Sequence, residues 1–203
     1  MSFDFQRREH FLSAALLFEG SLVVVAYAIG YFTHIDPLAR WTWSWQGLGW
    51  GLAATGPMFA LFLIMQRYPL GSLRGIREFL IESLGPILAN CRWYDLIFIA
   101  VLAGVTEELL FRGVLQPWWG LSWSNVAFGL VHSVTPTYAL LAGGVGLYLG
   151  WILETSNNLL APTIAHALYD YLAFLVVLSD WRKRQRVLHN RDTERDSPEP
   201  ALQ

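Results

Sequence analysis

A long uncharged stretch decides the fold: GVLQPWWGLSWSNVAFGLVHSVTPTYALLAGGVGLYLGWIL, residues 113–153, contains no Asp, Glu, Lys or Arg in 41 positions. Three other runs are nearly as apolar: residues 11–32 hold one charge, residues 47–66 none, and residues 159–179 only Asp170. A helix that crosses a bilayer needs about 20 mostly apolar residues. Buried helices of a water-soluble protein would alternate with charged faces. The pattern therefore predicts helices that span a membrane.

The composition of the 203-residue chain agrees with this prediction. Apolar residues make up 54% and charged residues 15%, and the mean hydropathy is +0.37. A typical soluble domain is about 25% charged. The 15% of aromatic residues argues against disorder. A net charge of −2 gives no basic surface for nucleic acid, so we expect no nucleic-acid partner.

We expect an all-α fold, a polytopic transmembrane helix bundle with about six crossings. The predicted crossings are residues 11–33, 47–66, 95–115, 122–135, 138–155 and 159–180, of which the fourth is short for a span. Between the second and third, residues 71–90 place apolar side chains at helical spacing, with most Arg and Glu off that stripe. This pattern indicates an amphipathic helix in the membrane interface, and a short seventh membrane segment is the alternative.

The basic residues predict the orientation and the extent of the membrane part. With the N-terminus inside, six crossings place twelve of the 14 Lys and Arg residues on the inner side and only Arg40 in an outer loop. The positive-inside rule then predicts cytoplasmic N- and C-termini. Compact size and the lack of a targeting presequence favour a bacterial inner membrane. We expect one integral membrane domain over residues 1–180 and a solvated tail without a fold over residues 181–203.

Ionisable residues inside the apolar spans are few, and the densest group is TEELLFRG at residues 106–113. Such residues are costly in a membrane and mark functional sites. Glu108 and Arg112 are four positions apart, so they share a helix face and can pair. Glu107 lies about 100° further around the helix and faces elsewhere. Glu107 therefore fits a general base, whereas Glu108 and Arg112 fit a structural pair.

Two later segments add imidazoles and a carboxylate. His132 ends the segment FGLVH, where a lone His is more often a core residue than a ligand. His166 and Asp170 in HALYD share a helix face, so Asp170 can orient His166 or bind a metal beside it. Glu19 lies in the middle of the first span without an evident partner, and the sequence leaves its role open.

Three interpretations of these residues remain open. Glu107, His132, His166 and Asp170 come from three different spans, and together they could activate a water molecule. The same four side chains could instead coordinate a divalent metal such as Zn²⁺, and a metal-held water also leads to hydrolysis. Ion or proton transport is the third interpretation. The chain shows no paired broken helices or duplicated halves, which disfavours transport.

Three motifs with fixed internal spacing follow one another along the chain: Glu107-Glu108-x-x-x-Arg112, Phe128-x-x-x-His132 and His166-x-x-x-Asp170. They resemble the three-motif signature of the CPBP family, the CAAX-type intramembrane endopeptidases and bacteriocin-processing or self-immunity proteins that are also called Abi. The resemblance covers about residues 95–178, and Phe-Arg-Gly-x-Leu-Gln at residues 111–116 is also typical. It implies an all-helical membrane bundle with its active site within the membrane.

The resemblance also implies roles and a function. Glu107 would activate water with help from His132, and Glu108 and Arg112 would support the site. We therefore expect an intramembrane endopeptidase whose partners are the lipid bilayer and a peptide or lipidated protein substrate. A prenylated tail, a leader peptide and a membrane sorting tail all remain open as substrates. The alternative is a non-catalytic bacteriocin self-immunity or binding protein on the same scaffold.

One position departs from the resemblance. His166 and position 170 would stabilise the oxyanion of the scissile carbonyl, and the best-characterised CAAX proteases have Asn at the second of these. Asp170 can donate to an oxyanion only when protonated, so it is neutral, orients His166, or ligates a metal. The family has been described both as metalloproteases and as metal-independent glutamate-type enzymes. Cofactor use stays open: either none, or Zn²⁺ held by Glu107, His132, His166 and Asp170.

Overall fold

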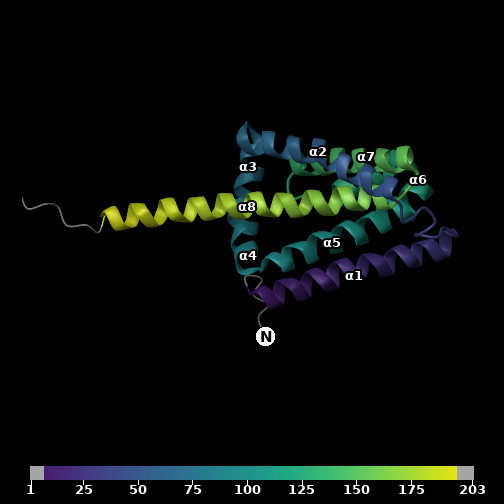
Figure 1. Cartoon of the computed structure of the whole chain (residues 1–203), viewed down its shortest axis with the longest axis horizontal. Helices are drawn as coiled ribbons and strands as arrows, with labels where there is room; N and C mark the ends of the chain where they lie inside the picture. The colour runs from purple at the N-terminus through teal and green to yellow at the C-terminus, as the bar shows by residue number, and fades with distance from the viewer. Residues whose placement is uncertain (1–6, 196–203) are drawn as a thin grey trace, which may run out of the picture.

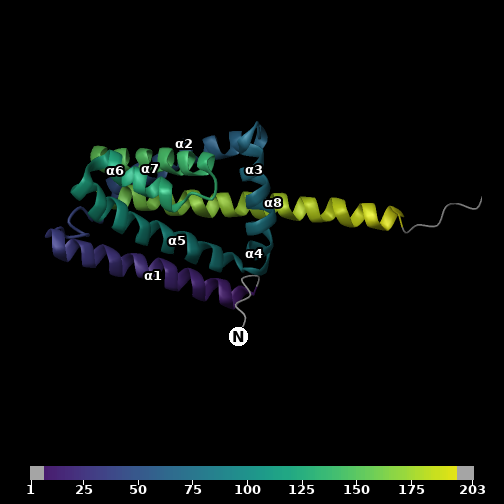
Figure 2. The same ribbon diagram turned by 180° about the vertical axis from the view of Figure 1, so that it is seen from behind.

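The computed structural model describes residues 7–195, and this part of the chain is helical without any strand. Four long helices, α1 (Arg8–Thr33), α2 (Trp45–Arg67), α7 (Pro136–Ser156) and α8 (Leu160–Arg195), run along a common direction (Figure 1). The view from behind shows the same layered arrangement, with α5 between α1 and α8 (Figure 2). The predicted all-α helical membrane bundle is confirmed.

Four described helices are long and apolar enough to cross a membrane, namely α1, α2, α7 and α8. Helix α5 (Trp93–Leu110) is not one of these four helices. It carries three carboxylates, those of Asp95, Glu107 and Glu108, and is therefore too charged to count as a clear membrane span. The six predicted crossings therefore include four segments with clear spanning character, and the total number of crossings stays a prediction.

The predicted third and fourth crossings, residues 95–115 and 122–135, are divided by a break at Gly120. Helix α5 continues through a π-helical turn, η2 (Phe111–Leu115), into α6 (Gln116–Val131). The helical path breaks at Gly120, whose φ of 80° and ψ of 166° lie outside the helical region. Glycine adopts such a conformation because it has no Cβ. The chain turns here, so that the rest of α6 packs against α7.

The predicted helix over residues 71–90 is present as three consecutive pieces, α3 (Ser72–Phe79), the π-helical turn η1 (Leu80–Leu84) and α4 (Gly85–Asn90). This segment crosses one end of the bundle instead of running along it (Figure 1). Ile76 of the predicted apolar stripe is buried, but the other buried apolar residues, Ile81 and Leu88, lie one position after the stripe residues Leu80 and Ile87. At Gly85, an added Cβ would lie 2.7 Å from the Trp181 ring, so α4 and α8 approach closely.

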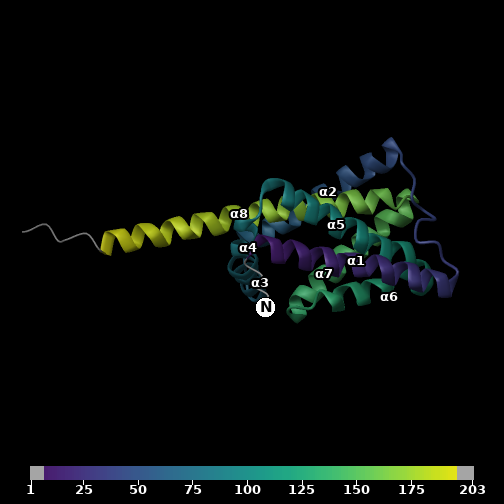
Figure 3. The same cartoon turned by 90° about the horizontal axis from the view of Figure 1, so that it is seen from below.

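The expectation of a tail without a fold is wrong for residues 181–195. Helix α8 continues to Arg195 and projects beyond the bundle (Figure 3). Arg, Lys, Gln and Leu are good helix formers, and adding residues to an existing helix is easier than starting one. Arg184 also pairs with Glu82 at 3.0 Å, which ties the projecting part to η1. Residues 196–203 lie outside the described residues.

Close packing of three helices positions the motif residues. Helix α5 packs between α1 and α8, and η2 and α6 pack together. An added Cβ on Gly104 would lie 2.9 Å from the Cβ of Ala167, so the backbones of α5 and α8 come close near Glu107 and His166. An added Cβ on Gly146 would lie 2.9 Å from the Phe128 ring. Small residues at these contacts allow the motif-bearing helices to meet.

Candidate active site

The pairing that the four-residue spacing predicts between Glu108 and Arg112 is present. Arg112 Nη1 donates to Glu108 Oε1 at 3.0 Å, and Nη2 donates to the carbonyl oxygen of Gly146 at 2.7 Å. The guanidinium also lies over the ring of Phe128, 4.5 Å from its centroid. Glu108 is 0% and Arg112 1% exposed, so the pair lies fully inside the bundle and connects α5, α6 and α7.

His166 joins this buried pair to the third motif. Its Nδ1 lies 2.8 Å from Glu108 Oε1, the same oxygen that accepts from Arg112. Its Nε2 lies 3.5 Å from Asp170 Oδ2. Because an ionised carboxylate only accepts, Nδ1 of His166 is the donor toward Glu108. The ring thus stands between two carboxylates, one at each nitrogen.

Glu107 and His132 form a second, looser pair. Glu107 Oε2 lies 3.5 Å from His132 Nε2 and has no hydrogen-bond partner among residues 7–195. His132 Nδ1 lies 2.8 Å from the carbonyl oxygen of Phe128, and the imidazole stacks on the Phe128 ring at 4.4 Å between centroids. The carbonyl can only accept, so Nδ1 carries a hydrogen and, in the neutral ring, Nε2 keeps its lone pair.

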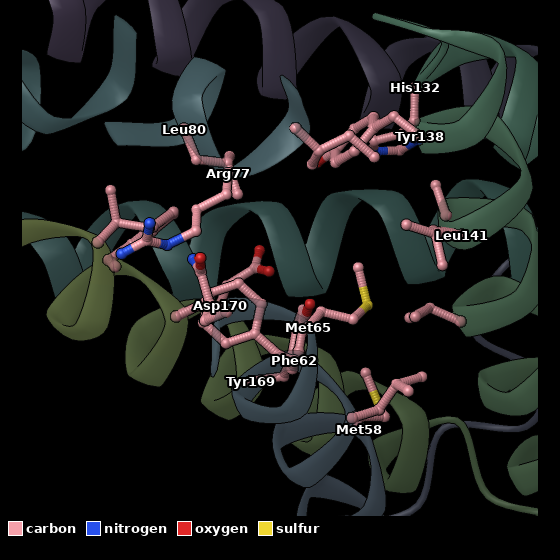
Figure 4. A pocket seen from close by; sticks show the side chains of 18 of the residues that line it. Met58, Phe62, Met65, Arg77, Leu80, His132, Tyr138, Leu141, Tyr169 and Asp170 are labelled. Atoms are coloured by element: carbon pink, nitrogen blue, oxygen red, sulfur yellow. The ribbon is translucent and has the colours of Figure 1, made fainter. Parts of the chain in front are cut away.

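One cavity brings the sequence-predicted residues together. Glu107, His132, His166 and Asp170 all line a hollow of about 250 Å³, whereas Glu108 and Arg112 do not. Its other walls come from α2, α3, η1, α7 and α8 and are mostly apolar. Figure 4 shows the surrounding side chains, with His132 and Asp170 among them.

Several cavity residues were missed by the sequence analysis. Met58 and Phe62 come from α2, Arg77 from the α3 segment, and Tyr138 and Tyr169 from α7 and α8 (Figure 4). Helices α2 and α3 carry no motif, so only the three-dimensional packing places them beside the carboxylates. The sequence offers no signal for Arg77, because Arg74 and Glu78 stand on either side of it in the same amphipathic segment.

Glu19, whose role the sequence leaves open, has a hydrogen-bond partner in the structure. Thr106 Oγ1 donates to Glu19 Oε2 at 2.5 Å, and both residues are buried. Thr106 directly precedes Glu107 in α5, so this bond ties α1 to α5 at the level of the site. Glu19 does not line the cavity.

The zinc interpretation was tested against this geometry. Among the described residues, no three His, Cys, Asp or Glu side chains are arranged so that they could hold one metal ion. His166 Nδ1 is also engaged by Glu108, which leaves only Nε2 of that ring toward the cavity side chains. The four expected ligands therefore do not fit a zinc site in this arrangement.

Comparisons with known proteins confirm the resemblance for the motif-bearing segment. Residues 88–172 match the family model "Type II CAAX prenyl endopeptidase Rce1-like". The uncharacterized protein YpbD of Bacillus subtilis (strain 168) is 32% identical over 108 residues, which are 51% of this chain and 57% of that protein. The chain therefore covers little more than half the length of this relative. No solved structure matches. The family match and the four apolar helices support an integral membrane protein.

Proposed function

We propose that this chain is an intramembrane endopeptidase, which hydrolyses a peptide bond with a water molecule activated by Glu107 and His132. One observation carries the proposal: both residues line the same mostly apolar cavity as His166 and Asp170, while the neighbouring ion pair lies behind it. An under-paired carboxylate beside an imidazole in a cleft is a typical general-base arrangement.

The position of the water follows from the two unpaired acceptors. Glu107 Oε2 and His132 Nε2 are 3.5 Å apart, and each can accept one hydrogen of the same water molecule. This arrangement would hold the water with an oxygen lone pair free for attack. Glu107 takes a proton as the water oxygen bonds to the scissile carbonyl carbon, and His132 orients the water.

His166 is placed to stabilise the charge that this attack creates. Glu108 accepts from Nδ1 of the ring and Asp170 lies 3.5 Å from Nε2, so two carboxylates favour the imidazolium form. No hydrogen bond joins Nε2 to Asp170 at this distance, so the Nε2–H is available to donate to the oxyanion in the tetrahedral intermediate. Collapse of the intermediate breaks the C–N bond, and the proton held by Glu107 passes to the leaving nitrogen.

Asp170 acts through His166 in this scheme. It lies 3.5 Å from Nε2 of that ring, so it can hold the imidazolium in place. An ionised Asp directly at the oxyanion would repel the developing charge. The substitution of Asp for the Asn of the best-characterised relatives is therefore consistent with an orienting carboxylate.

The surroundings of the site support a membrane-bound peptide or lipidated protein as substrate. The cavity walls are mostly apolar, and the family model that matches is that of a prenyl endopeptidase. The positive-inside bias of the sequence supports cytoplasmic N- and C-termini. We propose a bacterial inner membrane as the location.

The test uses the purified full chain in liposomes with a pool of membrane-inserting peptides, whose cleavage is followed by mass spectrometry. Glu107→Gln is expected to lower the cleavage rate by about 10²–10⁴-fold, because the general base is lost. Glu78→Gln, a change of an exposed Glu outside the cavity, is the matched control and should cleave normally. Normal cleavage by Glu107→Gln would refute the mechanism.

Two further arms separate the alternatives. Addition of a chelator is expected to leave the cleavage rate unchanged, and loss of activity together with stoichiometric zinc would refute the metal-free scheme. If the chain is instead an immunity protein, its protection of a host against a bacteriocin would survive loss of both His132 and His166.

A further inference from the structure

Glu19 is the only Asp, Glu, Lys or Arg among residues 11–32, and the proposed mechanism does not use it. Its side chain is buried in the bundle, whereas Leu17 and Phe18 beside it are exposed. A carboxylate within a membrane helix is costly, and such residues are functional candidates. Helix α1 lies outside residues 88–172, so the family match assigns no role to Glu19.

Holding α1 to the bundle does not in itself require a carboxylate. Helix α1 packs mainly against α5, and its other buried residues, Ala26 and Gly30, are small and apolar. Small residues of this kind let membrane helices pack closely without any charge. A buried polar pair with satisfied hydrogen bonds instead fixes one specific arrangement of the elements that it joins. The bond between Glu19 and Thr106 therefore sets how α5 is aligned with α1.

The alignment matters because Thr106 directly precedes the two glutamates of the first motif. Consecutive side chains leave a helix in directions about 100° apart, so Thr106 and Glu108 point about 200° apart. Thr106 is bonded to Glu19 of α1, and Glu108 is held by two hydrogen bonds in the interior of the bundle. The two outer residues thus fix α5 from nearly opposite sides, and Glu107 between them lines the cavity.

Glu107 depends on this arrangement because few contacts fix its own side chain. Its Oε2 lies 3.5 Å from His132 Nε2 and has no hydrogen-bond partner in the described part of the chain, residues 7–195. A π-helical turn, η2, begins at Phe111, so the regular hydrogen bonding of α5 ends about one turn after Glu107. The direction of the Glu107 side chain therefore follows the rotation of α5 about its own axis.

We propose that Glu19 of α1 is a positioning residue for the cleavage reaction, which fixes the rotation of α5 through its bond to Thr106 and so keeps Glu107 facing the cavity. The inference rests on the proposed function, in which Glu107 is the general base. It gives the first span a part in the reaction, although α1 itself does not line the cavity.

The test measures kcat and KM for cleavage of one membrane peptide by the full chain in liposomes, together with thermal melting. Glu19→Leu removes the acceptor and should fold, because Leu is favourable in a membrane helix and Thr106 Oγ1 can turn to the carbonyl oxygen of Ala103, 3.4 Å away. We expect kcat to fall about 10–100-fold with KM and the melting midpoint unchanged, since a displacement of about 1 Å can cost this much.

Three further variants assign the loss to positioning. Glu19→Gln keeps an acceptor for the Thr106 hydroxyl and should retain a nearly normal kcat. In a Glu107→Gln background, Glu19→Leu should lower the residual rate no further, because it acts through Glu107. Glu9→Leu is the matched control: it removes an exposed carboxylate from the first turn of the same helix and should leave kcat unchanged.

A second measurement does not depend on cleavage. With Cys91→Ser removing the single native thiol, Glu107→Cys reacts with a small water-soluble thiol reagent at a rate that reports how far position 107 faces the cavity. Adding Glu19→Leu should slow this labelling. Leu141→Cys, on the α7 wall of the same cavity, should be labelled at the same rate with and without Glu19→Leu.

Normal kcat in Glu19→Leu, or unchanged labelling at position 107, would overturn the proposal. A loss of kcat that Glu19→Gln shares would also overturn it, because the charge and not the hydrogen bond would then be required. A further loss in the Glu107→Gln background would leave Glu19 only a structural role. Failure of the proposed function is distinct: Glu107→Gln would then cleave normally, or no peptide would be cleaved, and the labelling rates would still decide whether Glu19 positions Glu107.

Discussion

Glu107 and Glu108 are neighbours in the chain, yet they belong to two very different regions of the molecule. Glu108 faces the closed interior, where one of its oxygens accepts from both Arg112 and His166 at 3.0 and 2.8 Å. Glu107 faces the cavity, where Oε2 lies 3.5 Å from His132 and has no hydrogen-bond partner among the described residues. Helix geometry alone separates them, because successive residues differ by about 100°.

Two glutamates inside one membrane protein can therefore have different roles, and the surroundings of each carboxylate decide which role it has. In the closed region, one oxygen of Glu108 is held by two fixed partners, while its Oε2 is buried without a hydrogen bond among residues 7–195 and does not face the cavity. Glu107 likewise has one oxygen without a hydrogen bond, but it lines the cavity and is open to a substrate. Measurements of stability and of activity therefore distinguish the two regions.

The largest effect on stability is expected in the closed region. Arg112→Met removes the partner of Glu108 and the donor to Gly146, which leaves a buried carboxylate without its main counter-charge. Breaking a buried ion pair from one side costs about 3–5 kcal/mol. Thermal melting of the purified protein in detergent should therefore show a strongly lowered midpoint, or the protein should fail to accumulate. A midpoint equal to that of the unmodified chain would show that the pair does not hold the bundle.

A smaller effect is expected where α7 meets this pair. In Gly146→Ala the new Cβ would lie 2.7 Å from Asn125 Oδ1, 2.9 Å from the Phe128 ring and 3.1 Å from Arg112 Nη2. Overpacking of this kind costs about 1–3 kcal/mol. Gly144→Ala is the matched control on the same helix, since nothing lies within 4 Å of its added Cβ. Equal melting curves for the two variants would contradict the close packing at Gly146.

The smallest effect is expected at the edge of the cavity. Asp170→Ala removes the carboxylate 3.5 Å from His166 Nε2, and we expect cleavage to fall about tenfold, or 1.4 kcal/mol in the barrier. Asp170→Asn should lose less, because an amide can accept from His166 and can also donate to an oxyanion. Initial cleavage rates of the two variants on the same peptide show which variant is slower. An Asn variant slower than the Ala variant would show that the negative charge itself is required.

Much of the fold could be predicted because its causes are local. Apolar runs of about 20 residues mark membrane helices wherever they pack. The pair of Glu108 and Arg112, and the proximity of His166 to Asp170, follow from four-residue spacing on one helix. The break at Gly120 also falls between the predicted third crossing, which ends at residue 115, and the predicted fourth, which begins at residue 122.

The walls of the cavity could not be predicted, because they depend on contacts between distant parts of the chain. Phe62 and Arg77 meet the motif residues only through packing of α2 and α3 against the rest of the bundle. The partner of Glu19 is likewise 87 positions away, at Thr106. The helical continuation of α8 was missed because charged residues suggested a solvated tail, although most of them are also good helix formers.

The most direct test compares the two neighbouring carboxylates in one experiment, with Glu107→Gln and Glu108→Gln measured in parallel for thermal melting and for peptide cleavage. The account predicts that Glu107→Gln melts like the unmodified chain but does not cleave, because it lacks only the cavity base. Glu108→Gln should melt at a clearly lower temperature, because Arg112 and His166 lose their shared negative partner. A Glu107→Gln protein that cleaves at the normal rate would contradict the central claim.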